Sequence, residues 1–177
     1  MGENHTKLFP LISEAEIQKR VKELASQISS DYANLQPLLV GILKGAWIFM
    51  ADLARYLTIP VSFDFLTVSS YGTSTKTSGI VKIVTDLKTP IIEKDVLLVE
   101  DILDTGLTLK YILDNLQLRQ PRSLKTCVLL DKPERHQIDI KIDYLGFVVP
   151  NKFVVGYGID YNEQYRNLPY IAYIDKE

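Results

Sequence analysis

The sequence lacks the features of extracellular and membrane-spanning proteins. It has one cysteine in 177 residues, so no internal disulfide can form, and Cys127 lies in an apolar stretch that favours a buried thiol. The richest apolar region, residues 38–50, is interrupted by Lys44 and is shorter than the roughly 20 apolar residues that a membrane-spanning helix needs. These absences predict a soluble, cytoplasmic protein.

An excess of charge of one sign is also missing. Lys and Arg total 20, and Asp and Glu total 22, which gives a formal net charge of −2. This balance provides no general attraction to nucleic acid or to an anionic membrane, and we expect neither as a partner. Neither a Walker A motif nor a GxGxxG motif occurs, which argues against a P-loop kinase and a dinucleotide-binding enzyme.

The first third of the chain predicts a helix, a strand and a second helix. The expected helix over 13–33 starts with a capping box of Ser13 and Glu16, and its apolar residues recur at helical spacing. These residues are Ile17, Val21, Leu24, Ala25 and Ile28. An apolar strand over 38–43 then precedes a helix over 46–57. Its inward-facing residues should be Trp47, Met50, Leu53, Ala54 and Leu57.

The rest of the chain predicts more strands and one further helix. Strands over 61–68 and 80–86 flank a polar loop, 69–79, whose few apolar anchors and two glycines are typical of a mobile lid. The remaining strands are expected over 96–99, 124–132, 142–149 and 153–160, with a helix over 107–117 and a polar, aromatic tail. This order predicts a single α/β domain with a twisted, mainly parallel sheet flanked by helices.

Polar residues follow three of the predicted strands. They are Lys44 and Gly45, the segment from Glu100 to Thr108, and Asp131 with Lys132. Because ligands of open α/β sheets bind beyond the carboxyl ends of the strands, we expect these three clusters to share one site.

The sequence DTGLT, residues 104–108, has the composition of a phosphate-binding turn. A glycine turn that leads into a helix offers free backbone N–H groups, and Thr105 and Thr108 add hydroxyl donors. An ordinary helix start is the alternative. Glu100 and Asp101 directly precede this turn, and as carboxylates they suit a ribose diol with magnesium to offset their charge, unless they are simply solvated acids.

The segment VLLVEDILDTGLT, residues 96–108, closely resembles the ribose-phosphate signature of the type I phosphoribosyltransferases. The segments GILKGA, SSYG, LLDKPERH and KFVVGYGIDYNEQYRNLPYI also occur in the order expected for the hypoxanthine and hypoxanthine-guanine branch. The resemblance implies transfer of a phosphoribosyl group from phosphoribosyl pyrophosphate to N9 of a 6-oxopurine. Hypoxanthine is the expected base, with guanine as a second one, and magnesium is the expected cofactor.

The resemblance also implies roles within the signature. Glu100 and Asp101 would hold the ribose hydroxyls. The 5′-phosphate would lie against Asp104, Thr105, Gly106, Leu107 and Thr108. Asp104 would also reach N7 of the purine and act as the catalytic acid or base.

Pyrophosphate and purine would contact the other segments. The implied pyrophosphate ligands are Lys44, Gly45, Ser70, Tyr71 and Arg166, with an unusual cis peptide bond just before Lys44. Without the family, Lys44 is an ordinary loop lysine, Arg166 an ion-pair partner of Glu163, and Phe153 a strand core residue. The implied purine contacts are Lys132, Lys152, Phe153, Val154 and Asp160. Magnesium would meet Asp160, and also Glu100 and Asp101.

The family further implies a small hood over the base, built from about 1–37 and 150–177, and association into a homodimer or homotetramer. The nearest alternative is a xanthine-guanine transferase on the same fold. An RNA-binding regulator would need a basic face, which the composition does not provide. An inactive homologue is disfavoured because Lys44, Asp104, Lys132 and Asp160 are all present.

Overall fold

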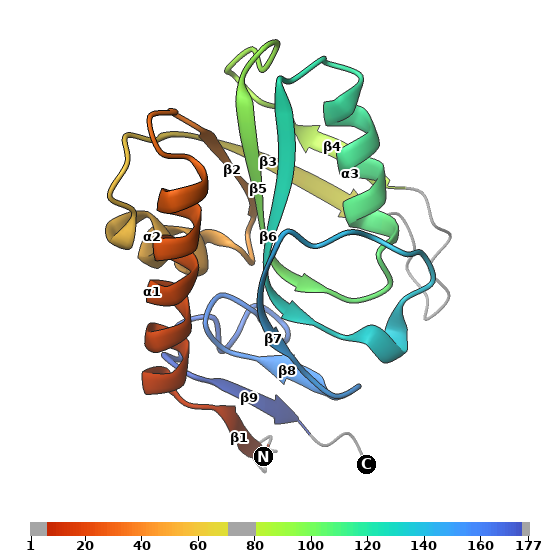
Figure 1. Cartoon of the computed structure of the whole chain (residues 1–177). Helices are drawn as coiled ribbons and strands as arrows, with labels where there is room; N and C mark the ends of the chain where they lie inside the picture. Colours follow the sequence, from red (N-terminus) through yellow and green to blue (C-terminus); the bar gives the residue numbers. More distant parts are fainter. Residues whose placement is uncertain (1–6, 71–80, 175–177) are drawn as a thin grey trace.

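The computed structural model describes residues 7–70 and 81–174, which form two β-sheets and three α-helices (Figure 1). The six-stranded main sheet has the order β4-β3-β2-β5-β6-β7. Its strands are β2 (Leu38–Leu43), β3 (Ser62–Ser70), β4 (Val81–Thr85), β5 (Asp95–Leu103), β6 (Ser123–Asp131) and β7 (Tyr144–Val148). All neighbouring strands of this sheet run parallel except β3 and β4, which confirms the mainly parallel α/β fold.

A second sheet of three antiparallel strands joins the two ends of the chain. Its order is β1-β9-β8. The strands are β1 (Leu8–Ile12), β8 (Phe153–Val155) and β9 (Ile171–Ile174). In Figure 1 the carboxyl ends of β5 and β6 point toward this small sheet, so the expected ligand edge faces the segment that the sequence assigns to the hood.

Helices cover both faces of the main sheet. α1 (Glu14–Asp31) and α2 (Trp47–Tyr56) pack side by side over one face, and α3 (Leu107–Gln117) covers the other (Figure 1). The Ser13–Glu16 capping box of α1 is present, and its five predicted apolar residues are all buried. The apolar stripes of α1 and α2 therefore share one core cluster, and the stripe of α3 belongs to a second cluster on the other side of the sheet.

The inward face of α2 differs from the prediction. Met50 and Leu53 are buried as expected, but Trp47 is 49% exposed and Phe49 is fully buried. The helix packs against both the sheet and α1, so its buried stripe centres on Phe49, Met50 and Leu53 rather than on Trp47. Cys127 is buried in β6, in agreement with a core thiol. Within the described ranges, no helix is long and apolar enough to cross a membrane.

Candidate functional site

The acidic pair of the signature lies inside β5. The sequence ends this strand at Val99, but its pairing with β6 continues to Leu103 opposite Asp131, so Glu100 and Asp101 belong to the sheet. Asp101 is buried, and one of its oxygens accepts the N–H of Ile102 at 2.9 Å. Removal from water and the adjacent Asp101 carboxylate raise the pKa of Glu100 well above its ordinary value.

The turn after β5 surrounds a small cavity. Gly106 has φ +85°, a left-handed conformation that favours glycine, and α3 starts at the next residue, Leu107. The Leu107 N–H donates to the Thr105 hydroxyl at 3.4 Å. The cavity of about 160 Å³ is lined by Glu100, Asp104, Thr105, Gly106 and Thr108, together with Ile102, Leu103 and Leu109. It thus joins the acidic pair to the helix N-terminus, where an anion is favoured.

The loop between β2 and α2 reaches this edge of the sheet. The peptide bond between Leu43 and Lys44 is cis, as the resemblance implies. A Cβ atom on Gly45 would overlap the Asp101 carboxylate, and a Cβ on Gly158 would overlap the Gly45 carbonyl oxygen. Glycine at both positions therefore allows the loop to fit between β5 and the segment that follows β8.

A network of four charged residues includes two predicted pyrophosphate ligands. Lys44 Nζ lies 2.9 Å from Glu163 Oε2, and both side chains are largely exposed. Arg166 NH2 lies 2.7 Å from Asp160 and 3.7 Å from Glu163, and its NH1 donates to the Gly158 carbonyl at 2.8 Å. Arg166 Nε is buried and has no hydrogen-bond partner in the described part of the chain. Glu163 thus contacts both cations where the sequence suggested an ion pair with one.

The segment after β6 folds onto the turn after β5. Lys132 is buried, and its pKa is lowered by burial and by the nearby Arg135, with Asp104 opposing the effect. Its backbone N–H donates to the Leu103 carbonyl at 3.0 Å. Arg135 Nε lies 2.9 Å from Asp104 Oδ1. The structure thus places Lys132 beside Asp104 and adds Arg135, which the sequence did not single out although Pro133 marks a tight turn there.

Two of the other predicted purine contacts, Phe153 and Val154, lie on β8 at the edge of the small sheet, while Lys152 directly precedes this strand and Asp160 follows it. Phe153 is 38% exposed, and its ring meets the Tyr161 ring edge-on with centroids 5.4 Å apart. The side chain of Val154 is buried, so only its backbone is available to read a base, and Lys152 Nζ lies 4.9 Å from the centroid of the Tyr173 ring.

Two further predictions reach the limit of the described residues. Ser69 and Ser70, which the sequence assigns to the lid, belong to β3, where they pair with Lys82 and Val81 of β4. Tyr71 and the remainder of the lid, 71–79, lie outside the described residues.

Among the described residues, no three His, Cys, Asp or Glu side chains form a group that could hold a metal ion alone, so a magnesium ion here would also need ligands from the substrate. Glu100 and Asp101 are adjacent in β5, and their mutual repulsion contributes to the raised pKa of Glu100, which a cation would relieve. Asp160 lies next to Arg166 and accepts the Glu163 N–H at 2.8 Å. Carboxylate oxygens are the protein ligands that magnesium prefers, and the ion commonly completes its shell with substrate phosphate and water.

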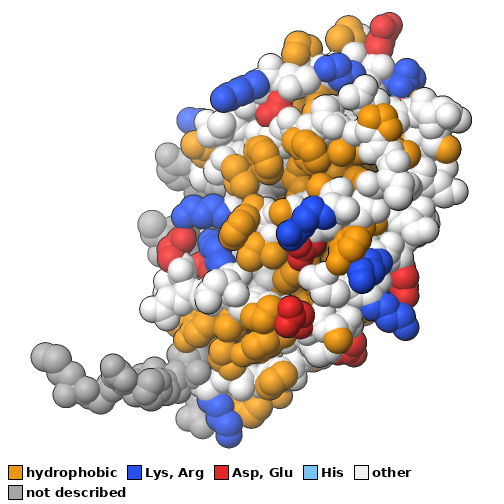
Figure 2. All heavy atoms as spheres, turned by 90° about the vertical axis from the view of Figure 1, so that its left-hand side faces the viewer, with side chains coloured by type: hydrophobic (Ala, Val, Ile, Leu, Met, Phe, Trp, Pro, Cys, Tyr) orange, Lys and Arg blue, Asp and Glu red, His pale blue; other side chains and the backbone are white. Residues whose placement is uncertain are grey.

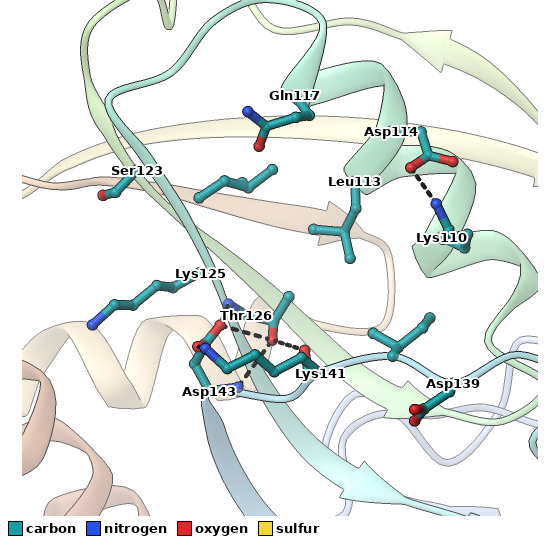
Figure 3. A pocket seen from close by; sticks show the side chains of 12 residues that line it. Lys110, Leu113, Asp114, Gln117, Ser123, Lys125, Thr126, Asp139, Lys141 and Asp143 are labelled. Atoms are coloured by element: carbon teal, nitrogen blue, oxygen red, sulfur yellow. Dashed lines mark hydrogen bonds and ion pairs between the residues drawn. The ribbon is translucent and has the colours of Figure 1, made fainter.

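A larger cavity, of about 520 Å³, lies between α3 and β6 (Figure 3). It contains none of the predicted site residues. Several of its charged side chains pair with one another, Lys110 with Asp114 and Lys141 with Asp143. Thr126 also bonds to the Lys141 carbonyl and the Asp143 carboxylate, as the dashed lines in Figure 3 show. The candidate site therefore remains at the carboxyl edge of the sheet.

Known proteins resemble this chain along most of its length. The family described as "Phosphoribosyl transferase domain" matches residues 13–162. The hypoxanthine-guanine phosphoribosyltransferase of Bacillus subtilis is 53% identical over 162 residues, which cover 92% of this chain and 90% of the relative. The enzyme of the same name from Aquifex aeolicus is 52% identical over 170 residues, 96% of each chain.

A solved structure gives the same result at the level of the fold. The hypoxanthine phosphoribosyltransferase of Staphylococcus aureus superposes with a TM-score of 0.90 at 48% identity, covering 94% of this chain and 90% of that one. With a matching family, relatives at about half identity and a shared fold, this chain belongs to the phosphoribosyltransferase family, in its hypoxanthine-guanine branch.

Proposed function

We propose that the protein transfers the 5-phosphoribosyl group of phosphoribosyl pyrophosphate to N9 of hypoxanthine and of guanine, which yields IMP or GMP and pyrophosphate in purine salvage. The observation that carries this proposal is the meeting of Glu100, Asp101, the 104–108 turn and Lys132 at one edge of the main sheet. The names of the relatives from Bacillus subtilis and Aquifex aeolicus support the choice of bases. The cytoplasm is the proposed location.

The ribose and its phosphate occupy β5 and the turn that follows it. The carboxylates of Glu100 and Asp101 accept hydrogen bonds from the 2′ and 3′ hydroxyls. The backbone N–H groups and hydroxyls of 105–108 donate to the 5′-phosphate at the N-terminus of α3. Leu107 can serve in this turn because the backbone, rather than its side chain, supplies the donor.

Asp104 handles the proton of the base. As the bond between N9 and the anomeric carbon forms, the bond from that carbon to pyrophosphate breaks, and the purine loses a proton. The Asp104 carboxylate accepts this proton from N7 and returns it in the reverse reaction. Lys132 donates to the 6-oxo group, Phe153 stacks on the ring, and the backbone of Val154 reads its edge, with Lys152 beside it.

Pyrophosphate is held from the opposite side. Lys44, the Gly45 backbone and Arg166 donate to its oxygens, and the contact of both Lys44 and Arg166 with Glu163 supports this assignment because it places the two cations close together. Asp160, Glu100 and Asp101 would hold a magnesium ion, which would supply positive charge to offset that of the departing pyrophosphate. Ser70 and Tyr71 are proposed to complete the pyrophosphate site, and the small sheet is proposed as the hood over the base.

The face formed by α2 and β3 is the proposed surface for self-association. Trp47 of α2 is 49% exposed and Phe63 of β3 is 46% exposed. A Cβ atom on Gly41 would contact both Met50 of α2 and Phe65, so Phe65 lies on the α2 side of the sheet. Phe63 lies on the same side because residues two positions apart in a strand share a face. Figure 2 looks onto the side that carries α1 and α2 and shows hydrophobic side chains gathered on it. Exposed aromatic residues of this kind favour a homodimer or homotetramer.

Pyrophosphate release tests the proposed reaction. The purified protein is assayed with phosphoribosyl pyrophosphate, magnesium and one of four bases, namely hypoxanthine, guanine, xanthine and adenine. We expect turnover with hypoxanthine and guanine. Good turnover with xanthine beside near-zero turnover with hypoxanthine would instead establish a xanthine-guanine transferase.

A further inference from the structure

We propose that Arg135 is a positioning residue for Asp104, a role that rests on the proposed function of Asp104 as the acid or base. Arg135 Nε donates to Asp104 Oδ1 at 2.9 Å. Both side chains are roughly half exposed, at 46% and 42%, so the pair adds little to the stability of the fold. Its placement at the reacting carboxylate calls for a different explanation.

Backbone hydrogen bonds hold the two segments together on either side of this pair. The Lys132 N–H donates to the Leu103 carbonyl, and the Gln137 N–H donates to the Thr105 carbonyl, each at 3.0 Å. Residue 103 precedes Asp104 and residue 105 follows it, so the chain that carries Arg135 is fixed against both neighbours of Asp104. The ion pair therefore has a fixed frame, unlike a pair between two freely moving surface side chains.

The turn that carries Arg135 is itself constrained. It is a short 3₁₀ helix, Pro133–Arg135, which starts at a proline, and the Arg135 N–H donates to the Lys132 carbonyl at 2.9 Å. The next residue, His136, contacts Asp131 at 2.6 Å through its ring. These contacts fix the backbone of Arg135 before any ligand arrives, which lowers the entropy lost when its side chain is ordered.

The chemistry of the contact leaves Asp104 able to react. A carboxylate has two oxygens, and Arg135 Nε contacts Oδ1, which allows Oδ2 to face N7 of the purine. The guanidinium cannot take up the transferred proton because arginine remains charged at all relevant pH values. Arg135 can therefore hold the orientation of Asp104 without competing for its proton. Lys132 is not proposed to orient Asp104, because its ammonium group donates to the 6-oxo group of the purine in the proposed function.

A double-mutant cycle tests this role. Arg135→Gln, Asp104→Asn and the double variant are assayed with hypoxanthine, together with Arg135→Lys. We expect Arg135→Gln to lower kcat on the order of tenfold with an unchanged KM for phosphoribosyl pyrophosphate, because misorientation of a reacting group costs rate rather than binding. In the Asp104→Asn background the same change should cost nothing further, since the group that Arg135 positions is already gone. Arg135→Lys should retain most of kcat.

Arg119→Gln is the matched control. Arg119 also pairs with an aspartate, Asp86, at 2.8 and 2.9 Å, but on the surface near α3, and its loss should leave kcat unchanged. The positioning role would be overturned if Arg135→Gln left kcat unchanged, or if it lowered kcat equally in the wild-type and Asp104→Asn backgrounds. In either case an active wild-type protein would leave the proposed function intact. If Arg135→Gln does not fold, Arg135→Lys is used in its place. An Arg135→Lys variant that, like the Arg119→Gln control, loses no kcat supports the role, and a full loss of kcat contradicts it. A wild-type protein inactive with hypoxanthine would overturn the proposed function and this role with it.

Discussion

Two carboxyl groups of β5 illustrate how single residues divide between stability and function. Asp95, at the start of the strand, bonds to Arg122 and to the Ser123 hydroxyl, and these contacts hold its pKa below the ordinary value. Glu100, near the other end, has a raised pKa because of burial and the adjacent Asp101. One acid is stabilised in its charged form by the fold. The other is kept in a costly position, which is expected of a residue that binds a ligand.

Glu100→Gln should stabilise the free protein. The folded state holds the Glu100 proton to a higher pH than the unfolded state does, so wild-type stability falls as the pH rises from about 4.5 through the raised folded pKa. The variant avoids this loss and should gain about 1 kcal/mol at neutral pH, with no gain near pH 4. Thermal unfolding from pH 4 to 8 measures the difference.

The same substitution should weaken binding of phosphoribosyl pyrophosphate, because an amide is a poorer acceptor for a ribose hydroxyl than a carboxylate is. Asp95→Asn provides a control on the same strand: it should destabilise the fold and spare the binding constant. A Glu100→Gln variant that melts below the wild type at pH 7, with full affinity, would contradict the assignment.

At the scale of elements, the loop between β2 and α2 is fixed by close backbone contacts. Gly45→Ala should weaken binding of phosphoribosyl pyrophosphate on the order of tenfold or more, because the new Cβ would overlap the Asp101 carboxylate and displace either the loop or the acid. Isothermal titration of the purified variant measures this loss.

Gly41→Ala, in β2, is the comparison for that experiment. Its Cβ would overlap the buried Met50 side chain and crowd the partly exposed Phe65 ring, so it should lower the melting temperature and leave the affinity of the folded protein unchanged. If Gly45→Ala instead behaves like Gly41→Ala, the loop has a structural role and its part in the site is wrong.

The sequence predicted elements well where local signals suffice. α3 spans Leu107–Gln117, as its periodicity predicts, and the capping box of α1 is present. β1 and β9 were not predicted, because each is short and gains its partner from the opposite end of the chain. The exposure of Trp47 was not predicted for a related reason. Periodicity shows that α2 has an apolar stripe, but the packing of α1 against α2 decides which residues of that stripe are buried.

At the scale of the whole molecule, the sequence predicted which segments meet at one edge of the main sheet, but it did not predict the contacts between their side chains. Parallel strands bring their carboxyl ends to one edge, which placed Lys44, Asp104 and Lys132 near one another in advance. The contacts between Lys44 and Glu163 and between Arg135 and Asp104 join residues 119 and 31 positions apart. No local pattern encodes such pairs, because they depend on how loops fold back over the sheet.

Self-association is a prediction for the whole molecule. Trp47→Glu combined with Phe63→Glu should shift the sedimentation velocity profile to a smaller species, because two charges would be buried at the proposed interface. Leu118→Glu is the control, since Leu118 is 84% exposed at the C-terminal end of α3 on the other face. An identical profile for wild type and the double variant would show that the α2 and β3 face is not the interface.

The role of Asp104 is the central claim, and one variant tests it most directly. Asp104→Asn keeps the size and the backbone donors of the turn but cannot accept a proton. Steady-state turnover with hypoxanthine, measured beside the dissociation constant of phosphoribosyl pyrophosphate, should show a loss of kcat on the order of 10² or more with binding retained. Turnover equal to that of the wild type would contradict the account and remove Asp104 from the mechanism.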